Sequence, residues 1–137
     1  MATKIKETLV EPYNGFLDKH LKDNNLSFYF QDYLYKLANE CLEDYCGGQW
    51  EFVELSNGGF YWYLDEEDCV LTSMNGWSDT ISGKAAGLGL TICVLNHAMW
   101  QFQENDEVLK ILYTKYNKAL QYSRGIPEAV KLICFLD

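Results

Sequence analysis

The chain has 137 residues, of which 48% are hydrophobic and 15% aromatic, and its formal net charge is −9 at pH 7. This length supports one hydrophobic core, and the composition excludes an intrinsically disordered chain because it can bury enough apolar surface to offset chain entropy. The N-terminal residues lack the apolar segment of a secretory signal. The longest apolar stretch, residues 85–100, is interrupted and too short to cross a bilayer. We therefore expect one compact cytoplasmic domain without a membrane segment.

The negative charge gathers in one part of the chain, which we call the acidic sector. Residues 31–68 contain ten acidic side chains and a single lysine, Lys36, and so carry the whole net charge. A sector of this kind repels the phosphate backbone, which disfavours direct binding to nucleic acid and favours a partner protein with a basic surface. The alternative is ordinary solubilising charge.

The five cysteines do not follow a disulfide or zinc pattern. Their number is odd, no Cys-x-x-Cys spacing occurs, and only two histidines are present to complete a metal site. We expect reduced thiols and neither a metal nor another cofactor. The cysteines are Cys41, Cys46, Cys69, Cys93 and Cys134.

The first 25 residues are polar apart from a short apolar group at positions 16–21, which forms either helical turns or a loosely held arm. In the next segment apolar residues recur at i, i+3, i+4 and i+7, which predicts an amphipathic helix over residues 28–46. Ser27 is suited to its N-cap and Gly47-Gly48 to its end. The acidic sector begins on the solvated face of this helix.

Two runs rich in aromatic and β-branched residues, 49–55 and 60–64, flank the sequence Ser56-Asn57-Gly58-Gly59. Asn-Gly favours a two-residue type I′ turn, because both central residues need positive φ and the resulting twist matches that of the strands. We therefore predict a hairpin over residues 49–64. Its core face then carries Leu55 opposite Phe60 and Val53 opposite Trp62, and its half-exposed face carries Glu54 opposite Tyr61 and Phe52 opposite Tyr63.

The remainder of the chain reads as short strands followed by helices. We predict strands over residues 70–73 and 77–81, joined at Asn75-Gly76, and helices over residues 83–102, 106–123 and 127–136. Ser82 is the expected N-cap of the first of these helices, which is apolar nearly all round and therefore central. The predicted fold class is α+β: a single domain with a small antiparallel sheet, including the central hairpin, packed against several α-helices.

No motif of a nucleophile, a phosphate loop or a zinc protease is present. His97 could serve as a general base with Asp79 or a thiol, but on so apolar a helix we expect a buried or half-buried structural histidine. Glu51 and Glu54 fall on opposite faces of their strand, so they cannot form an acid–base pair. The acidic run 65–68 lacks the alternating spacing of a calcium loop.

A distinctive block of fifteen residues lies at positions 47–61: Gly-Gly-Gln-Trp-Glu-Phe-Val-Glu-Leu-Ser-Asn-Gly-Gly-Phe-Tyr. This block resembles the signature of the ArdB/KlcA antirestriction family. The likeness covers residues 26–137, after a variable arm over residues 1–25. It departs from the family at Cys46 and Ile126, where a small serine-like residue and a histidine are usual. Supporting matches are Ala85-Ala86-Gly87, Leu95-Asn96-His97, Ile126-Pro127-Glu128-Ala129 and the terminal Asp137.

The resemblance implies an α+β fold, a cytoplasmic location and relief of type I restriction of incoming plasmid or phage DNA, without an agreed active site. Our leading hypothesis is that the chain is not an enzyme and binds a protein, either a type I restriction–modification component or an associated host factor. The alternatives are mimicry of DNA phosphates by the acidic sector and an enzyme centred on His97.

The hairpin supplies the candidate contacts for that partner. The predicted outward-facing contacts are Glu51, Glu54, Tyr61 and Tyr63, since aromatic residues beside acids make good contacts for a partner that presents arginine. The alternative is that the helix over residues 28–46 or the N-terminal arm covers the half-exposed, aromatic face of the hairpin. The turn residues act through backbone geometry rather than through contact. They are Ser56, Asn57, Gly58 and Gly59.

Overall fold

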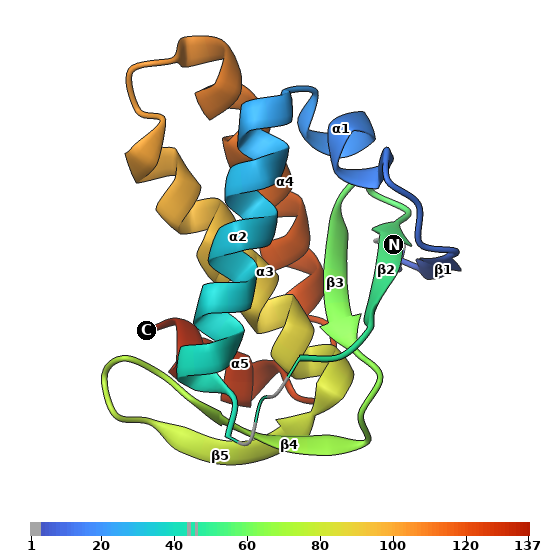
Figure 1. Cartoon of the computed structure of the whole chain (residues 1–137). Coiled ribbons are helices and arrows are strands. Elements are labelled where there is room, and N and C mark those ends of the chain that lie inside the picture. The colour runs from blue at the N-terminus through green and yellow to red at the C-terminus, as the bar shows by residue number, and fades with distance from the viewer. Residues whose placement is uncertain (1–3, 44, 46) are drawn as a thin grey trace.

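The computed structural model describes residues 4–43, 45 and 47–137 (Figure 1). It has two small antiparallel sheets and several helices, which confirms the predicted α+β class. In chain order the elements are β1 (Glu7–Val10), α1 (Phe16–Leu21), α2 (Asn24–Cys41), β2 (Trp50–Leu55), β3 (Phe60–Leu64), β4 (Asp68–Thr72), β5 (Ser78–Ser82), α3 (Gly83–Gln101), α4 (Asp106–Ser123) and α5 (Ala129–Leu136).

Residues 7–21 belong to the folded structure. β1 pairs antiparallel with β2 and forms one edge of a sheet with the order β1-β2-β3. α1 follows, and its Phe16 and Leu21 are completely buried. The apolar group at positions 16–21 therefore forms helical turns, the first of the two alternatives that the sequence offered.

α2 begins and ends earlier than predicted. Its N-cap is Asp23, whose side chain accepts a hydrogen bond from the Leu26 backbone N–H, rather than Ser27. The helix ends at Cys41 instead of residue 46, because Leu42 turns extended and forms an isolated bridge with Leu71 of β4. Asp44 and Cys46 lie outside the described residues.

The β2–β3 hairpin forms as predicted, but its register differs by one residue. Leu55 N–H donates to the Gly59 carbonyl and Gly58 N–H donates to the Leu55 carbonyl, so the loop contains three residues, with Gly58 at φ +93°. This is a type I turn followed by a bulge glycine, the other hairpin loop that an Asn-Gly sequence can form. The observed pairs include Glu54 with Phe60, Val53 with Tyr61 and Phe52 with Trp62.

The one-residue shift changes which side chains share a face, because neighbouring side chains of a strand point to opposite faces. Phe52, Phe60 and Trp62 lie together beneath α1 and α2, where Phe60 packs against Phe16 and Phe30. All five residues of β3 are buried. The predicted pairing, and with it a half-exposed aromatic face on β3, is therefore wrong.

α3 is the central helix, as predicted, and lies along the edge of β3 that β2 does not cover. The Thr91 hydroxyl accepts a hydrogen bond from the Trp62 backbone N–H at 3.2 Å. Gly87 makes this approach possible, because a Cβ there would lie 2.3 Å from the Trp62 carbonyl oxygen. The edge strand is thus capped by a helix, one of the ways in which proteins protect sheet edges.

The other elements pack around α3. β4 and β5 form a two-stranded sheet, as predicted for residues 70–73 and 77–81, and lead into the Ser82 N-cap of α3. α4 packs beside α3 along much of its length, while α5 covers its lower part (Figure 1). α5 begins at Ala129 rather than at position 127. Among the described residues, none of the helices has the length and apolar character that a membrane crossing requires.

Candidate functional site

The tip of the β2–β3 hairpin is fixed to α4. The Asn57 side chain accepts from the Gly59 backbone N–H at 3.0 Å and donates to the Lys118 carbonyl at 3.0 Å. Lys115 Nζ donates to the Gly58 carbonyl at 2.7 Å. The turn residues of the signature block therefore place the hairpin against a helix that lies more than fifty residues later in the chain.

Glu54 holds the same end of the hairpin to α1. Its Oε2 accepts from Lys19 Nζ at 2.8 Å and from His20 Nε2 at 2.6 Å. These contacts lower the pKa of Glu54, with the Lys19 hydrogen bond as the largest cause. Glu54, predicted as a free outward-facing contact, is thus half-buried and engaged within the chain.

His20 is a buried histidine between two aromatic rings. Phe16 and Phe60 lie 4.7 and 4.9 Å from it, measured between ring centroids. Burial is the main reason why the pKa of His20 is lowered, and the charge of Lys115 adds to the effect. A neutral ring fits both contacts, because Nε2–H then donates to Glu54 and Nδ1 accepts from Lys115 Nζ at 3.2 Å.

Glu7 of the edge strand β1 is the centre of a second network. Its Oε2 accepts from the hydroxyls of Tyr61 and Tyr122, at 2.6 and 2.8 Å, and its Oε1 accepts from Lys84 Nζ at 2.6 Å. Burial raises the pKa of Glu7, but these hydrogen bonds outweigh it and the pKa is lowered overall. Burial is also the main cause that raises the pKa of Tyr61, so this hydroxyl stays protonated and donates.

The predicted outward orientation of the two hairpin tyrosines is wrong. Tyr61 is 2% exposed and Tyr63 is 7% exposed. Tyr61 points toward Glu7 and Tyr122, and Tyr63 toward Lys84, whose Nζ lies 5.6 Å from the ring centroid. Of the four predicted contacts, Glu51 is partly exposed and appears in neither network.

Three segments that carry the family resemblance meet in one cavity of about 200 Å³ at the start of α3. Tyr61 comes from the signature block, Ser82 and Ala85 from the start of α3, and Glu128 from the segment before α5. Glu128 accepts from both the Ser82 backbone N–H and the Ser82 hydroxyl, at 2.9 and 2.5 Å. The same hydroxyl accepts from the Ala85 N–H and caps α3.

His97 is exposed, so the expectation of a buried or half-buried histidine is wrong. It lies near the end of α3, where the helix extends past the sheet; its Nδ1 contacts the Tyr29 hydroxyl and its ring stacks on Tyr33 at 4.2 Å. Asp79 precedes the start of α3 and cannot reach it across a helix of about 28 Å. Cys93 is one turn away, but burial raises the pKa of its thiol to about 12.

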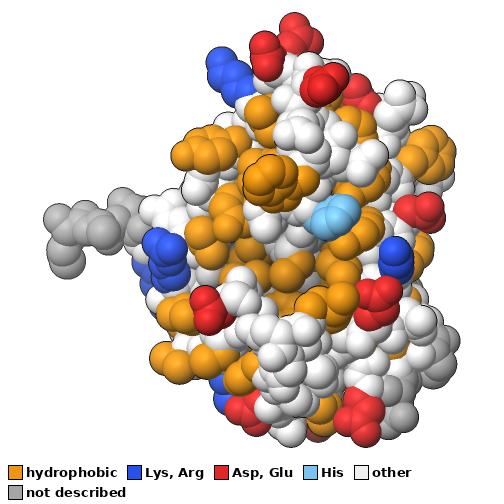
Figure 2. Space-filling model, turned by 90° about the vertical axis from the view of Figure 1, so that its left-hand side faces the viewer, with side chains coloured by type: hydrophobic (Ala, Val, Ile, Leu, Met, Phe, Trp, Pro, Cys, Tyr) orange, Lys and Arg blue, Asp and Glu red, His pale blue; other side chains and the backbone are white. Residues whose placement is uncertain are grey.

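Around His97 lies a surface that the sequence did not reveal, which we call the aromatic face. Phe28 is 77% exposed, Trp100 68% and Met74 82%. Hydrophobic side chains gather there around an exposed histidine, with acidic side chains toward the margins (Figure 2). Together with these three residues and His97, the aromatic face comprises Tyr29, Tyr33 and Cys93.

Comparisons with known proteins agree with this architecture. A solved structure from work on KlcA and ArdB matches 100% of both chains with a TM-score of 0.82 at 24% identity. That work describes, for those proteins, a novel fold and antirestriction activity against type I DNA restriction systems in vivo but not in vitro. The likeness confirms the fold expected from the resemblance.

Two Escherichia coli K12 proteins are similar in sequence. The putative antirestriction protein YubI is 36% identical over 81 residues, covering 58% of this chain and 57% of the relative. The uncharacterized protein YfjX is 30% identical over 99 residues, covering 69% of this chain and 62% of the relative. The chain thus spans roughly 60% of the length of these relatives. The model of the antirestriction protein family matches residues 43–137, and the chain belongs to that family.

Proposed function

We propose that the protein relieves type I restriction of incoming plasmid or phage DNA in the bacterial cytoplasm, by binding a protein and not by catalysis. Family membership supports the antirestriction role. The KlcA and ArdB proteins act in vivo but not in vitro, which supports a requirement for a cellular component beyond the purified restriction system. The partner is then a type I restriction–modification component or a host factor that acts with it.

The observation that carries this proposal is the aromatic face. Exposed Trp and Phe side chains are typical anchors of protein interfaces, and Trp100 and Phe28 are both more than two-thirds exposed. His97 and Trp100 lie three residues apart on α3 and therefore neighbour each other on the helix surface. A patch that combines exposed aromatic side chains in this way supports binding to protein.

The lower part of the aromatic face is hollowed. A groove of about 390 Å³ is lined by Leu37 and Cys41 of α2, Cys93 of α3, Met74 of the β4–β5 loop and Phe135 of α5. It can receive an apolar side chain of a partner, and the partly exposed ring of Tyr33 continues the surface toward His97.

The charges beside the aromatic face indicate the character of the partner surface. Asp32 lines a hollow with Phe28, and Glu40 lies close enough to Tyr33 to raise its pKa, although burial is the larger cause. Lys36 is the basic residue in that hollow. We infer that the partner presents an apolar anchor with basic residues around it, since complementary charges steer association.

Plating of unmodified phage on a restricting host tests the proposal. Trp100→Ser should remove most of the restriction relief while the purified variant keeps its unfolding temperature, because Trp100 is exposed. Leu9→Ser is the matched control: Leu9 is 61% exposed on β1, does not belong to the aromatic face, and the variant should retain full relief. Full relief by a folded Phe28→Ser/Trp100→Ser variant would refute the assignment of the aromatic face.

A second candidate function is mimicry of DNA phosphates. It is favoured by one observation: the Glu43 N–H donates to the Val70 carbonyl, which brings the acidic end of α2 close to β4 and the exposed acidic turn 65–68. Mimicry predicts that inhibition weakens steadily with salt and with each Glu→Gln or Asp→Asn change in that turn. Relief that is unaffected by neutralising residues 65–68 would exclude it.

A further inference from the structure

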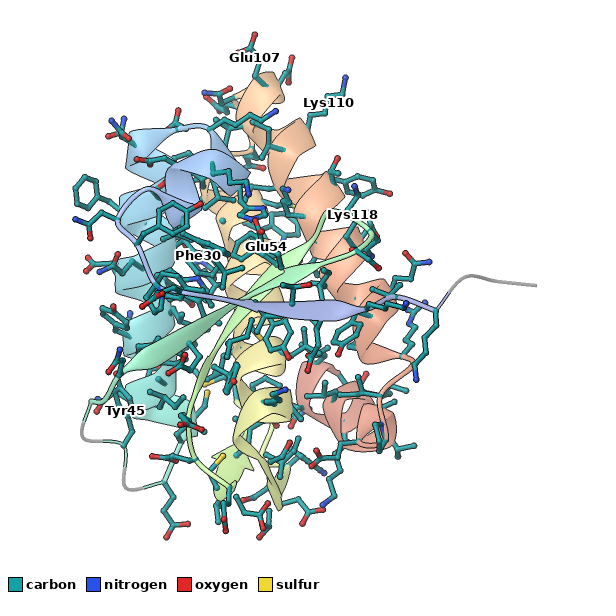
Figure 3. The ribbon with its side chains drawn as sticks, turned by 90° about the vertical axis from the view of Figure 1, so that its right-hand side faces the viewer. Phe30, Tyr45, Glu54, Glu107, Lys110 and Lys118 are labelled. Carbon is teal, nitrogen blue, oxygen red and sulfur yellow. The ribbon has the colours of Figure 1, made fainter. Side chains whose placement is uncertain are left out.

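Four lysines gather around the tip of the β2–β3 hairpin, and we call them the lysine cluster. Lys19 and Lys22 come from α1 and its C-cap, and Lys115 and Lys118 come from α4. They are four of the eleven Lys and Arg residues in a chain with a net charge of −9, so this concentration of positive charge is unusual for the chain. Figure 3 shows Lys118 at the hairpin tip on the same side as Glu54, and Lys110 well apart near the top of α4.

Short distances link Lys19, Lys115 and Lys118, and Lys22 is linked to them by its charge effect on Lys115. Lys115 Nζ lies 2.7 Å from the Gly58 carbonyl oxygen, and a Cβ at position 58 would lie 2.7 Å from Lys118 Nζ. Lys19 is connected to Lys115 through two side chains: Glu54 accepts from both Lys19 and His20, and His20 contacts Lys115. Burial is the main cause of the lowered pKa of Lys115, and the charges of Lys118, Lys22 and Lys19 lower it further. The ammonium groups are therefore close enough to repel one another.

This positive charge is only partly balanced. Glu54 is the carboxylate that pairs with Lys19. Asp18 accepts from the Ser27 hydroxyl and Asp23 caps α2, and among the described residues neither forms an ion pair with the lysine cluster. Within the part of the chain that the structure describes, Lys22 and Lys118 form no ion pair.

Lys22 occupies a position that suits glycine. It is the C-cap of α1 with φ +58°, and among the described residues it is the non-glycine residue with positive φ. Glycine or asparagine usually takes this position, because a side chain there adds strain. Strained residues concentrate at functional sites, so a lysine here points to a use for its charge.

We propose that the lysine cluster binds a compact, multiply charged phosphate group such as a diphosphate. A ligand with several charges relieves the mutual repulsion of the ammonium groups, whereas a single carboxylate neutralises only one of them. A long nucleic acid would in addition approach the acidic sector, which repels it. This site goes beyond the proposed function and does not depend on it.

Titration calorimetry with inorganic pyrophosphate tests the site. Lys22→Gly removes one charge and also relieves the strained backbone, so its unfolding temperature should equal or exceed that of the wild type. Its affinity for pyrophosphate should fall about fivefold, the effect of one charge at close range in water. Lys110→Gln makes the same charge change elsewhere on α4 and should leave the affinity unchanged. Glu54→Gln removes the carboxylate of the cluster and should raise the affinity.

Several results would overturn the proposal. The wild type failing to bind pyrophosphate at millimolar concentration, or Lys22→Gly binding it as tightly as the wild type, would show that the lysines only support the hairpin. Equal affinity for citrate would show that phosphate is not selected. Tighter binding of a short DNA duplex than of pyrophosphate would identify a nucleic-acid surface instead.

Discussion

Gly87 of α3 lies against Trp62 of β3 so closely that a Cβ at position 87 would be 2.3 Å from the Trp62 carbonyl oxygen and 2.4 Å from the Tyr63 Cα. Both neighbours are backbone atoms of a buried strand, so they cannot move aside as a flexible side chain would. Gly87→Ala should therefore lower the free energy of unfolding by about 3 kcal/mol or more, as overpacking does in a rigid core. Urea unfolding measures this.

Gly125→Ala provides the matched control for that prediction. The nearest atom to a Cβ at position 125 is 3.7 Å away, which is ordinary van der Waals contact. Its free energy of unfolding should change by less than about 0.5 kcal/mol. Equal stability of the two variants would mean that α3 does not lie against the edge of β3.

The hydroxyls of Tyr61 and Tyr122 donate to the same oxygen of Glu7, which predicts coupling between them. Tyr61→Phe and Tyr122→Phe should each lower the free energy of unfolding by about 1.5–3 kcal/mol, the usual value for a hydrogen bond to a charged group. The loss of unfolding free energy in the double variant should exceed the sum of the two single losses by roughly 0.5–1 kcal/mol. In each single variant the remaining donor partly compensates for the one that is lost. Tyr113→Phe, at an exposed position, should be neutral. Strict additivity would argue against the shared oxygen.

His20 predicts a specific dependence of stability on pH. Its pKa is lowered in the folded state, mainly by burial, so the unfolded chain takes up the proton first as the pH falls. The stabilising contribution is complete above the unfolded pKa of 6.5 and is lost below it, with a slope approaching about 1.4 kcal/mol per pH unit. Urea unfolding between pH 7.5 and 5 measures the effect.

The contribution of His20 can be told apart from those of the carboxylates, because they fall in different pH ranges. The lowered pKa values of Glu7 and Glu54 add a loss of stability only as the pH falls below about 4.5, the ordinary value for glutamate. His20→Gln should therefore remove the slope between pH 6.5 and 5. A slope that survives His20→Gln would assign the titration to another group.

Gly58 combines a positive φ of +93° with close contact to Lys118. A β-branched residue there should cost about 2 kcal/mol, because left-handed backbone is disfavoured for all residues except glycine and, less so, asparagine. Gly58→Val should thus lose stability and restriction relief together, and Gly58→Asn should lose roughly half as much. Relief that is lost in a Gly58→Val variant of normal stability would instead point to direct contact by the turn.

The helices and the hairpin could be predicted from the sequence because their signals are local. Ser82 and the apolar run after it specify α3, and Asp106–Ser123 matches the predicted helix. The hairpin register could not be predicted, because Asn57-Gly58 fits both a two-residue and a three-residue loop. The three-residue loop occurs together with contacts to residues that are distant in the sequence, such as Tyr61 with Glu7 and Asn57 with Lys118.

The exposure of the predicted site residues could not be predicted for a different reason. Both faces of β3 are covered, so Tyr61 and Tyr63 are buried although they lie on the opposite face from Phe60 and Trp62. β1 was not predicted, because four residues carry too little pattern, and without β1 the role of Glu7 was invisible. The apolar helix predicts a buried or half-buried His97, yet the end of α3 extends beyond the sheet and His97 is exposed there.

α3 covers the β3 edge of the three-stranded sheet. Among the described strands, the outer side of β1 is therefore the edge of this sheet to which a strand of another molecule could pair. That edge strand is four residues long, and Lys4 and Lys6 precede it. Short length and flanking charge both discourage pairing between molecules. Replacing Lys4 and Lys6 by neutral residues should therefore increase the tendency of the purified protein to form fibres.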